Sequence, residues 1–99
     1  MMAYEVSADV DTAHADRYVA YMRDKHIPEV LATGCFTGAE FAQSGVTSFR
    51  TRYLAETPAH VERYLAQYTQ ALRGDFMAHF PAGVTLARST WTVIERWPA

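Results

Sequence analysis

The chain has 99 residues, of which 49% are hydrophobic and 13% aromatic, and its formal net charge is −2. This length and apolar content predict a single domain spanning residues 1–99, with enough apolar surface for one core. Nucleic acids and anionic membranes are bound through basic surfaces, so the acidic balance predicts neither partner, and no apolar run approaches the roughly 20 residues that span a bilayer.

The first predicted strand covers residues 3–10, and a helix follows it. Apolar side chains at positions 4, 6, 8 and 10 have the period of two that indicates a strand with one covered face. Asp11 and Thr12 then offer an N-cap for the helix. From Tyr18 and Met22 onward an apolar stripe continues to position 31, which predicts an amphipathic helix.

Pro28 interrupts this helical pattern. Because proline lacks a backbone donor and clashes with the preceding turn, we predict that the helix kinks or breaks near Ile27, leaving His26 at the break. Gly34 is expected to end the helix in a backbone conformation that is unfavourable for other residues.

Two strands are predicted next, over residues 36–43 and 46–55, joined by a tight Ser-Gly turn. Alternation along the second of them places its aromatic pair on one face. Arg50 and Arg52 therefore project from the opposite face.

A second helix is predicted to start at Thr57-Pro58, a side-chain cap followed by proline at the first helical position. Its apolar stripe consists of Val61, Leu65, Tyr68, Leu72, Phe76 and Phe80. We predict one long helix that ends before Pro81, and a final strand over residues 84–95.

The resulting order β-α-β-β-α-β predicts an α+β, ferredoxin-like fold: a four-stranded antiparallel sheet in the order 4-1-3-2, with two helices on one face. The opposite face stays open in a single copy. Six tyrosines, five phenylalanines and two tryptophans are more large rings than one small core usually hides. We therefore expect a homodimer that closes through the open faces, a dimeric α+β barrel.

Three segments resemble the bacterial domain of unknown function 4286 family, and the match runs nearly end to end. These are Tyr4-Glu5-Val6, His26-Ile27-Pro28-Glu29-Val30-Leu31 with Thr33-Gly34-Cys35-Phe36, and Tyr53-Leu54-Ala55-Glu56 continuing to Tyr64-Leu65. The His-x-Pro…Gly-x-Phe skeleton is also similar to other dimeric α+β barrels, including antibiotic-biosynthesis monooxygenases and ethyl-tert-butyl-ether-degradation proteins. The resemblance implies the fold and dimerisation, and it supplies no catalytic residue.

His26 is the candidate catalytic residue. An imidazole titrates near neutral pH, so His26 could act as a general base for a phenol or enol at the mouth of a barrel. A structural role is the alternative, because a histidine near a helix end interacts favourably with the helix dipole or with Glu29 three residues later.

Arg50 and Arg52 are candidate ligand-binding residues. In the predicted strand order their face is flanked by Glu5 and Glu40, and we favour a charged ladder across the open face. The alternative is that one arginine stays unpaired inside a closed barrel and binds an acidic ligand through its fork of donors.

Cys35 is the single cysteine, so it cannot form an internal disulfide, and we interpret it as a small buried residue. The start of the chain lacks the plan of a signal peptide, and together these features predict a cytoplasmic protein. The four histidines are scattered without a second ligand at helical or hairpin spacing, so we predict no metal and no cofactor.

Two functions from different classes remain. The first is an accessory or binding role, in which the aromatic residues serve assembly and bind a small apolar or aromatic molecule. The second is a cofactor-free monooxygenase or isomerase that acts on a phenolic or polyketide-like substrate with His26 as general base. The lack of a recognisable acid and base pair favours the first.

Overall fold

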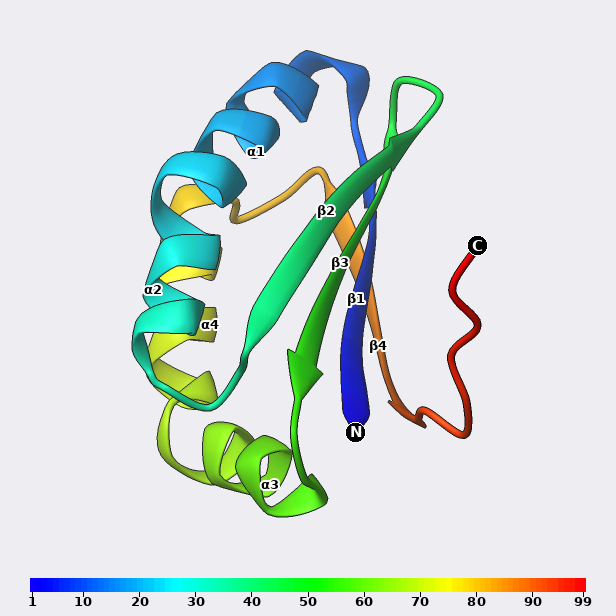
Figure 1. Cartoon of the computed structure of the whole chain (residues 1–99). Helices are drawn as coiled ribbons and strands as arrows, with labels where there is room; N and C mark the ends of the chain where they lie inside the picture. The colour runs from blue at the N-terminus through cyan, green and yellow to red at the C-terminus, as the bar shows by residue number, and fades with distance from the viewer.

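The computed structural model describes residues 1–99 and contains one four-stranded antiparallel sheet with helices on one of its faces (Figure 1). The strands are β1 (Met2–Val10), β2 (Gly38–Ser44), β3 (Ser48–Ala55) and β4 (Val84–Thr92). Their order is β2-β3-β1-β4, and each neighbouring pair is antiparallel. This confirms the predicted ferredoxin-like fold, since the order is 4-1-3-2 when read from the other edge.

The first helical region is continuous but changes type along its length. It consists of η1 (Thr12–His14), α1 (Ala15–Tyr21), the π-helical η2 (Met22–His26) and α2 (Ile27–Ala32). The N–H of Ile27 donates to the carbonyl of Met22, five residues earlier, which is the wider spacing of a π-turn. The predicted discontinuity before Pro28 is therefore present as a π-turn, and the chain stays helical through it. A wider turn accommodates a residue that cannot supply an N–H.

The ends of this region differ in part from the prediction. The side chain of Asp11 makes no capping hydrogen bond, and only its carbonyl is used, accepting from the N–H of His14 at 2.8 Å. Gly34 has a φ of 76°, the left-handed conformation expected after a helix end. Phe36 lies outside β2, because it turns into the core, where it is 7% exposed.

The prediction of a single long second helix is wrong. The structure contains α3 (Pro58–Gln67) and α4 (Thr69–His79), separated at Tyr68 by a non-helical backbone conformation. The hydroxyl of Thr69 donates to the carbonyl of Tyr64 at 3.0 Å and so competes with the regular ladder at this point.

The break changes which side chains face the core. Leu65 is 40% exposed, whereas Tyr64, outside the predicted stripe, is 4% exposed. At the start of α3 the Thr57 hydroxyl lies 2.6 Å from Nδ1 of His60 instead of capping a backbone donor as predicted.

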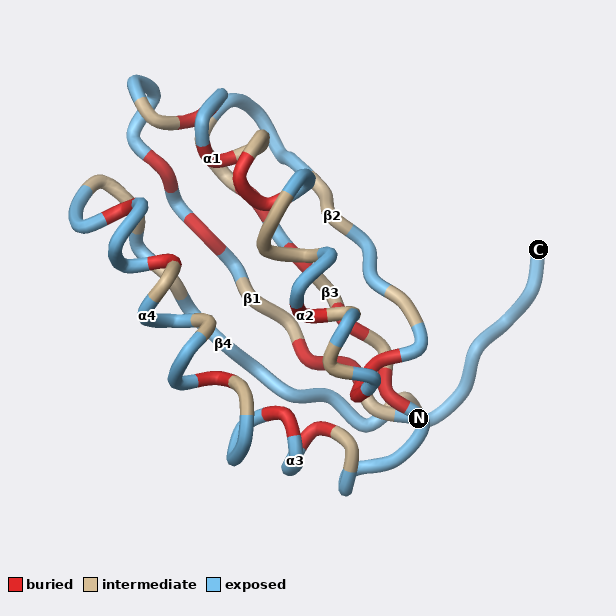
Figure 2. The backbone as a smooth tube through the Cα atoms, turned by 90° about the vertical axis from the view of Figure 1, so that its left-hand side faces the viewer, coloured by how far each residue is buried: buried red, intermediate tan, exposed pale blue.

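The core lies between the sheet and the helices, and Figure 2 shows buried residues in both layers. Two groups of aromatic rings fill it. One surrounds Tyr18, whose ring centroid lies 5.0 Å from that of Phe49. The other contains Tyr53 and Tyr64, both in contact with Phe36, at centroid distances of 5.2 and 5.0 Å.

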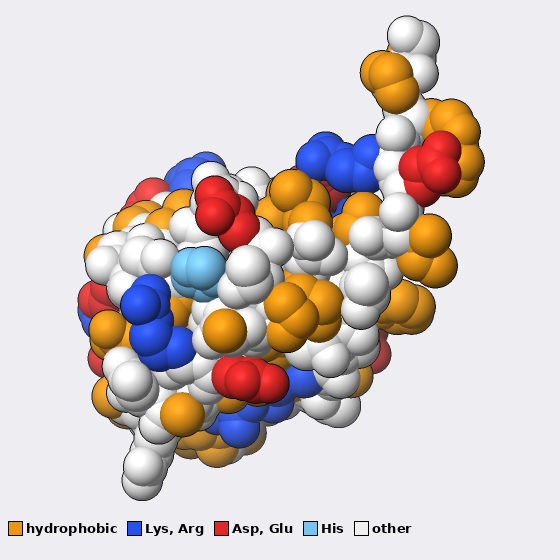
Figure 3. Space-filling view, turned by 60° about the horizontal axis from the view of Figure 1, so that its bottom comes forward, with side chains coloured by type: hydrophobic (Ala, Val, Ile, Leu, Met, Phe, Trp, Pro, Cys, Tyr) orange, Lys and Arg blue, Asp and Glu red, His pale blue; other side chains and the backbone are white.

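The open face of the sheet lies opposite the helices, and the C-terminal residues 93–99 run on that side (Figure 1). β4 ends at Thr92, earlier than predicted, because β1 begins at Met2 and offers no further pairing beyond the bond from Val93 to Met1. Ile94 is 95% exposed and Trp97 79% exposed. Figure 3 shows the C-terminal segment standing out from the body with hydrophobic side chains on it. None of the helices has the length and hydropathy to cross a membrane.

Candidate functional site

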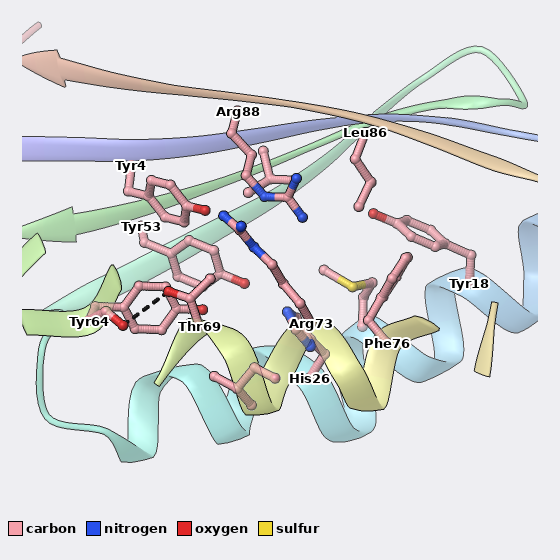
Figure 4. A pocket seen from close by; sticks show the side chains of 13 residues that line it. Tyr4, Tyr18, His26, Tyr53, Tyr64, Thr69, Arg73, Phe76, Leu86 and Arg88 are labelled. Atoms are coloured by element: carbon pink, nitrogen blue, oxygen red, sulfur yellow. Dashed lines mark hydrogen bonds between the residues drawn. The ribbon is translucent and has the colours of Figure 1, made fainter. Parts of the chain in front are cut away.

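A pocket of about 40 Å³ lies between the two layers, where the two aromatic groups meet. Its 13 lining residues, nine of them hydrophobic, come from both layers of the fold (Figure 4). The other four are His26, Thr69, Arg73 and Arg88, and four of the nine, Tyr4, Tyr18, Tyr53 and Tyr64, also carry a hydroxyl. No lining residue is an aspartate or a glutamate.

His26 reaches this pocket from the last position of the π-turn. Its ring stacks on Tyr21 at 5.7 Å and meets the edge of Phe76 at 6.1 Å. The Nδ1 atom is buried and has no hydrogen-bond partner. Burial lowers the pKa of His26 below its ordinary value of 6.5, against the opposing charges of Glu29 and Asp75. The imidazole is therefore neutral at pH 7, which is the form that a general base requires.

Tyr53 faces the pocket from the centre of the sheet and is 1% exposed. Its hydroxyl is buried without a hydrogen-bond partner. Burial raises the pKa of Tyr53 far above its ordinary range, so the phenol stays protonated and can act as a hydrogen-bond donor.

A polar network outside the pocket fixes the π-turn to α4. Tyr21 donates to Oδ2 of Asp75 at 2.6 Å, and Nζ of Lys25 bonds Asp75 at 2.9 Å and Glu29 at 3.0 Å. The hydrogen bonds from Tyr21 and Lys25 lower the pKa of Asp75, so it is ionised near neutral pH. Because α4 and the π-turn are neighbouring parts of the helix layer that lines the pocket, this network holds them together.

Sequence reasoning missed Arg73 and Arg88. Arg73 lies on α4 beside Leu72, and Arg88 lies on β4 two residues after Leu86. The period-two alternation of β4 was the signal that could have placed Arg88 on the face of Leu86, which also lines the pocket.

The two arginines that were expected to bind a ligand lie elsewhere, on the open face of the sheet. Nε of Arg50 is 3.2 Å from Glu5, and Nη2 of Arg50 is 3.1 Å from Glu40. Arg52 has no carboxylate within ion-pair distance, although its backbone is paired with both Glu5 and Glu40. The structure thus contains the charged ladder for Arg50 and does not bring either arginine to His26.

The remaining candidates are separate from the pocket. Cys35 is buried, and its Sγ accepts a hydrogen bond from Nε of Arg63 at 3.4 Å. No group of three or more histidine, cysteine, aspartate and glutamate side chains is arranged to hold a metal ion.

The model of the family described as domain of unknown function (DUF4286) matches residues 1–94. The chain belongs to this family. No functionally curated protein matches the chain.

Several solved structures share the fold. A mutant of a cofactor-independent oxygenase, SnoaB from Streptomyces nogalater, is 14% identical with a TM-score of 0.75, over 99% of this chain and 97% of that one. A candidate antibiotic biosynthesis monooxygenase from Deinococcus radiodurans is 15% identical with a TM-score of 0.71, over 100% and 98%. A dimeric ferredoxin-like protein from an uncultured marine organism is 12% identical with a TM-score of 0.74, over 97% of each chain. At these identities the likeness shows the fold.

Proposed function

We propose that the protein is a homodimeric binding protein for a small aromatic molecule, which is held in the pocket between the helices and the sheet. The observation that carries this proposal is that two buried polar atoms at the pocket, Nδ1 of His26 and the hydroxyl of Tyr53, have no partner in the protein. A buried polar group without a partner costs about 1–3 kcal/mol, which a ligand hydroxyl or carbonyl removes by bonding to it.

The surroundings of these atoms favour a planar ring. Aromatic rings from both layers line the pocket, and offset or edge contacts between rings are favourable beyond the area they bury. The pocket of about 40 Å³ is far smaller than the roughly 300–1,000 Å³ of sites for drug-sized ligands. Binding of even one ring therefore requires the wall to open, and Arg73 and Arg88 are exposed parts of it with long side chains.

A neutral phenol tests the binding role. We expect 4-cresol to shift the amide resonances of pocket residues in an NMR titration, and Tyr53→Phe to weaken its affinity about tenfold because one buried hydrogen bond is lost. Thr51→Val is the matched control, since Thr51 also has a buried hydroxyl without a partner but does not line the pocket. No shift at saturating 4-cresol would contradict the proposal.

A second candidate is the cofactor-free oxygenase or isomerase with His26 as base. The neutral imidazole beside the pocket favours it, since it can accept the proton of a phenol and leave an electron-rich phenolate. Oxygen uptake or isomer formation with 1,3-dihydroxynaphthalene distinguishes the two roles. Turnover that is lost in His26→Ala and kept in His60→Ala would support the enzyme role over the binding role.

The homodimer is proposed because the helices cover one face of the sheet only (Figure 1), while the exposed Trp91, Ile94 and Trp97 line a hollow with Arg50 and Arg52 on the other face. A second copy is the partner that would bury these side chains. One of the solved structures with this fold belongs to a dimeric protein.

The proposed setting is a single domain in the cytoplasm with no nucleic-acid partner. The lone cysteine is buried and unpaired, as is usual for proteins of reducing compartments. The net charge of −2 disfavours binding to phosphates.

A further inference from the structure

Arg73 and Arg88 are two cations without anionic partners at one small pocket. Neither takes part in any ion pair of the protein or in any hydrogen bond of its side chain. They reach the pocket from opposite walls, Arg73 from α4 and Arg88 from β4, and Figure 4 shows both side chains directed toward it.

This absence of acids is local to the pocket. The chain has 11 acidic residues against nine lysines and arginines, so carboxylates are not scarce. Some cations elsewhere are paired with carboxylates: Arg50 pairs with two glutamates, and Lys25 pairs with Asp75 and Glu29, whereas Arg52 is unpaired. Two guanidinium groups at the same pocket repel each other unless an anion lies between them.

The other polar groups of the pocket point to the same kind of ligand. The hydroxyl of Tyr53 is a buried donor without an acceptor, and the charges of Arg73 and Arg88 both act on the phenol of Tyr64. Arg88 also acts on the imidazole of His26. The pocket therefore combines hydrogen-bond donors and positive charge with an apolar, ring-lined interior.

From this geometry we infer that the ligand is an aromatic carboxylate, whose ring lies among the pocket tyrosines and whose carboxylate is bound by Arg73 and Arg88. The inference rests on the proposed binding function and names its ligand class. The planar fork of a guanidinium matches the two oxygens of a carboxylate, and charge-assisted hydrogen bonds are about twice as strong as neutral ones.

The same two arginines also provide a way for the pocket to open. Arg73 and Arg88 are exposed and lie at the surface end of the wall, so their side chains can rotate outward without disturbing the core. In these outward positions they bind the carboxylate, and the ring occupies the pocket together with the space that the two side chains leave.

Two probes of equal shape test the inference: 4-hydroxybenzoate and its neutral amide, 4-hydroxybenzamide, titrated by NMR into the full chain. We expect the carboxylate to bind about tenfold more tightly than the amide, because it alone forms charge-assisted bonds with the arginines. Arg73→Gln and Arg88→Gln should each reduce this preference. Arg52→Gln is the matched control, since Arg52 is also unpaired but lies on the opposite face of the sheet.

The outcomes separate the two proposals. Equal binding of both probes would overturn the inference of a carboxylate ligand, while the proposed binding of a small aromatic molecule would still hold. A preference that persists in Arg73→Gln and Arg88→Gln, or that is lost in Arg52→Gln, also overturns the inference. If neither probe nor 4-cresol binds, the proposed function falls together with it.

Discussion

His26 is a neutral imidazole in the folded protein because its surroundings desolvate the charged form more than nearby acids stabilise it. Glu29 and Asp75 favour the protonated ring, while Lys25 and Arg88 oppose it, and burial has the largest effect. The residue is therefore a hydrogen-bonding group at neutral pH and not an ion-pair partner.

This lowered pKa makes folding stability depend on pH in a defined direction. Well above pH 6.5 the ring is neutral in both the folded and the unfolded chain, so His26 does not reduce the free energy of unfolding. As pH falls below 6.5, the unfolded chain takes up the proton first, so the free energy of unfolding decreases until the folded pKa is passed. We expect His26→Gln to remove this part of the slope in urea titrations between pH 7 and 5. An unchanged slope would show that His26 is solvated.

At the scale of the element, the helix–loop–strand segment that ends at Gly34 depends on one backbone conformation. A side chain at Gly34 has free space around it, but its φ of 76° is unfavourable for residues with a Cβ.

Gly34→Ala is therefore expected to lower the free energy of unfolding by about 1 kcal/mol in urea denaturation. Gly38→Ala is the matched control, because a Cβ there also has free space and the backbone is an ordinary strand. Its stability should stay the same or rise. Equal losses in both variants would mean that the left-handed conformation is not what Gly34 provides.

On the scale of the whole molecule, the chain's own helices cover one sheet face, and the C-terminal segment runs on the side of the other (Figure 1). That second face also carries the charged ladder and Trp91. A sheet with one covered face and a protruding apolar segment is suited to association with an identical copy, because the same patch then buries itself twice.

Light scattering coupled to size exclusion tests this association. We expect a mass of about twice 11.1 kDa at micromolar concentration, falling to that of one chain in the double variant Ile94→Asp, Trp97→Asp, which places charge in the interface. Val46→Asp is the control, since Val46 is also exposed but lies in the β2–β3 turn, and this variant should remain dimeric. A monomeric wild-type chain would contradict the dimer.

The architecture could be predicted from sequence because its signals are local. Alternation marked the strands, Pro58 marked the start of α3, and Gly34 marked the end of α2, each through a backbone preference that acts within a few residues. The break at Tyr68 was missed because the hydroxyl of Thr69 replaces part of the helix ladder without changing the apolar spacing.

By itself the sequence determined the order of elements, the strand order and the polar ladder that involves Arg50, since period and handedness decide these. Only the tertiary structure determined which residues line the pocket. His26, Arg73 and Arg88 lie on three elements far apart in the chain, and nothing in their local spacing relates them. They share one site because the helices pack on the sheet face toward which the Arg88 side chain points from β4. This proximity is created by packing, and no short sequence motif encodes it.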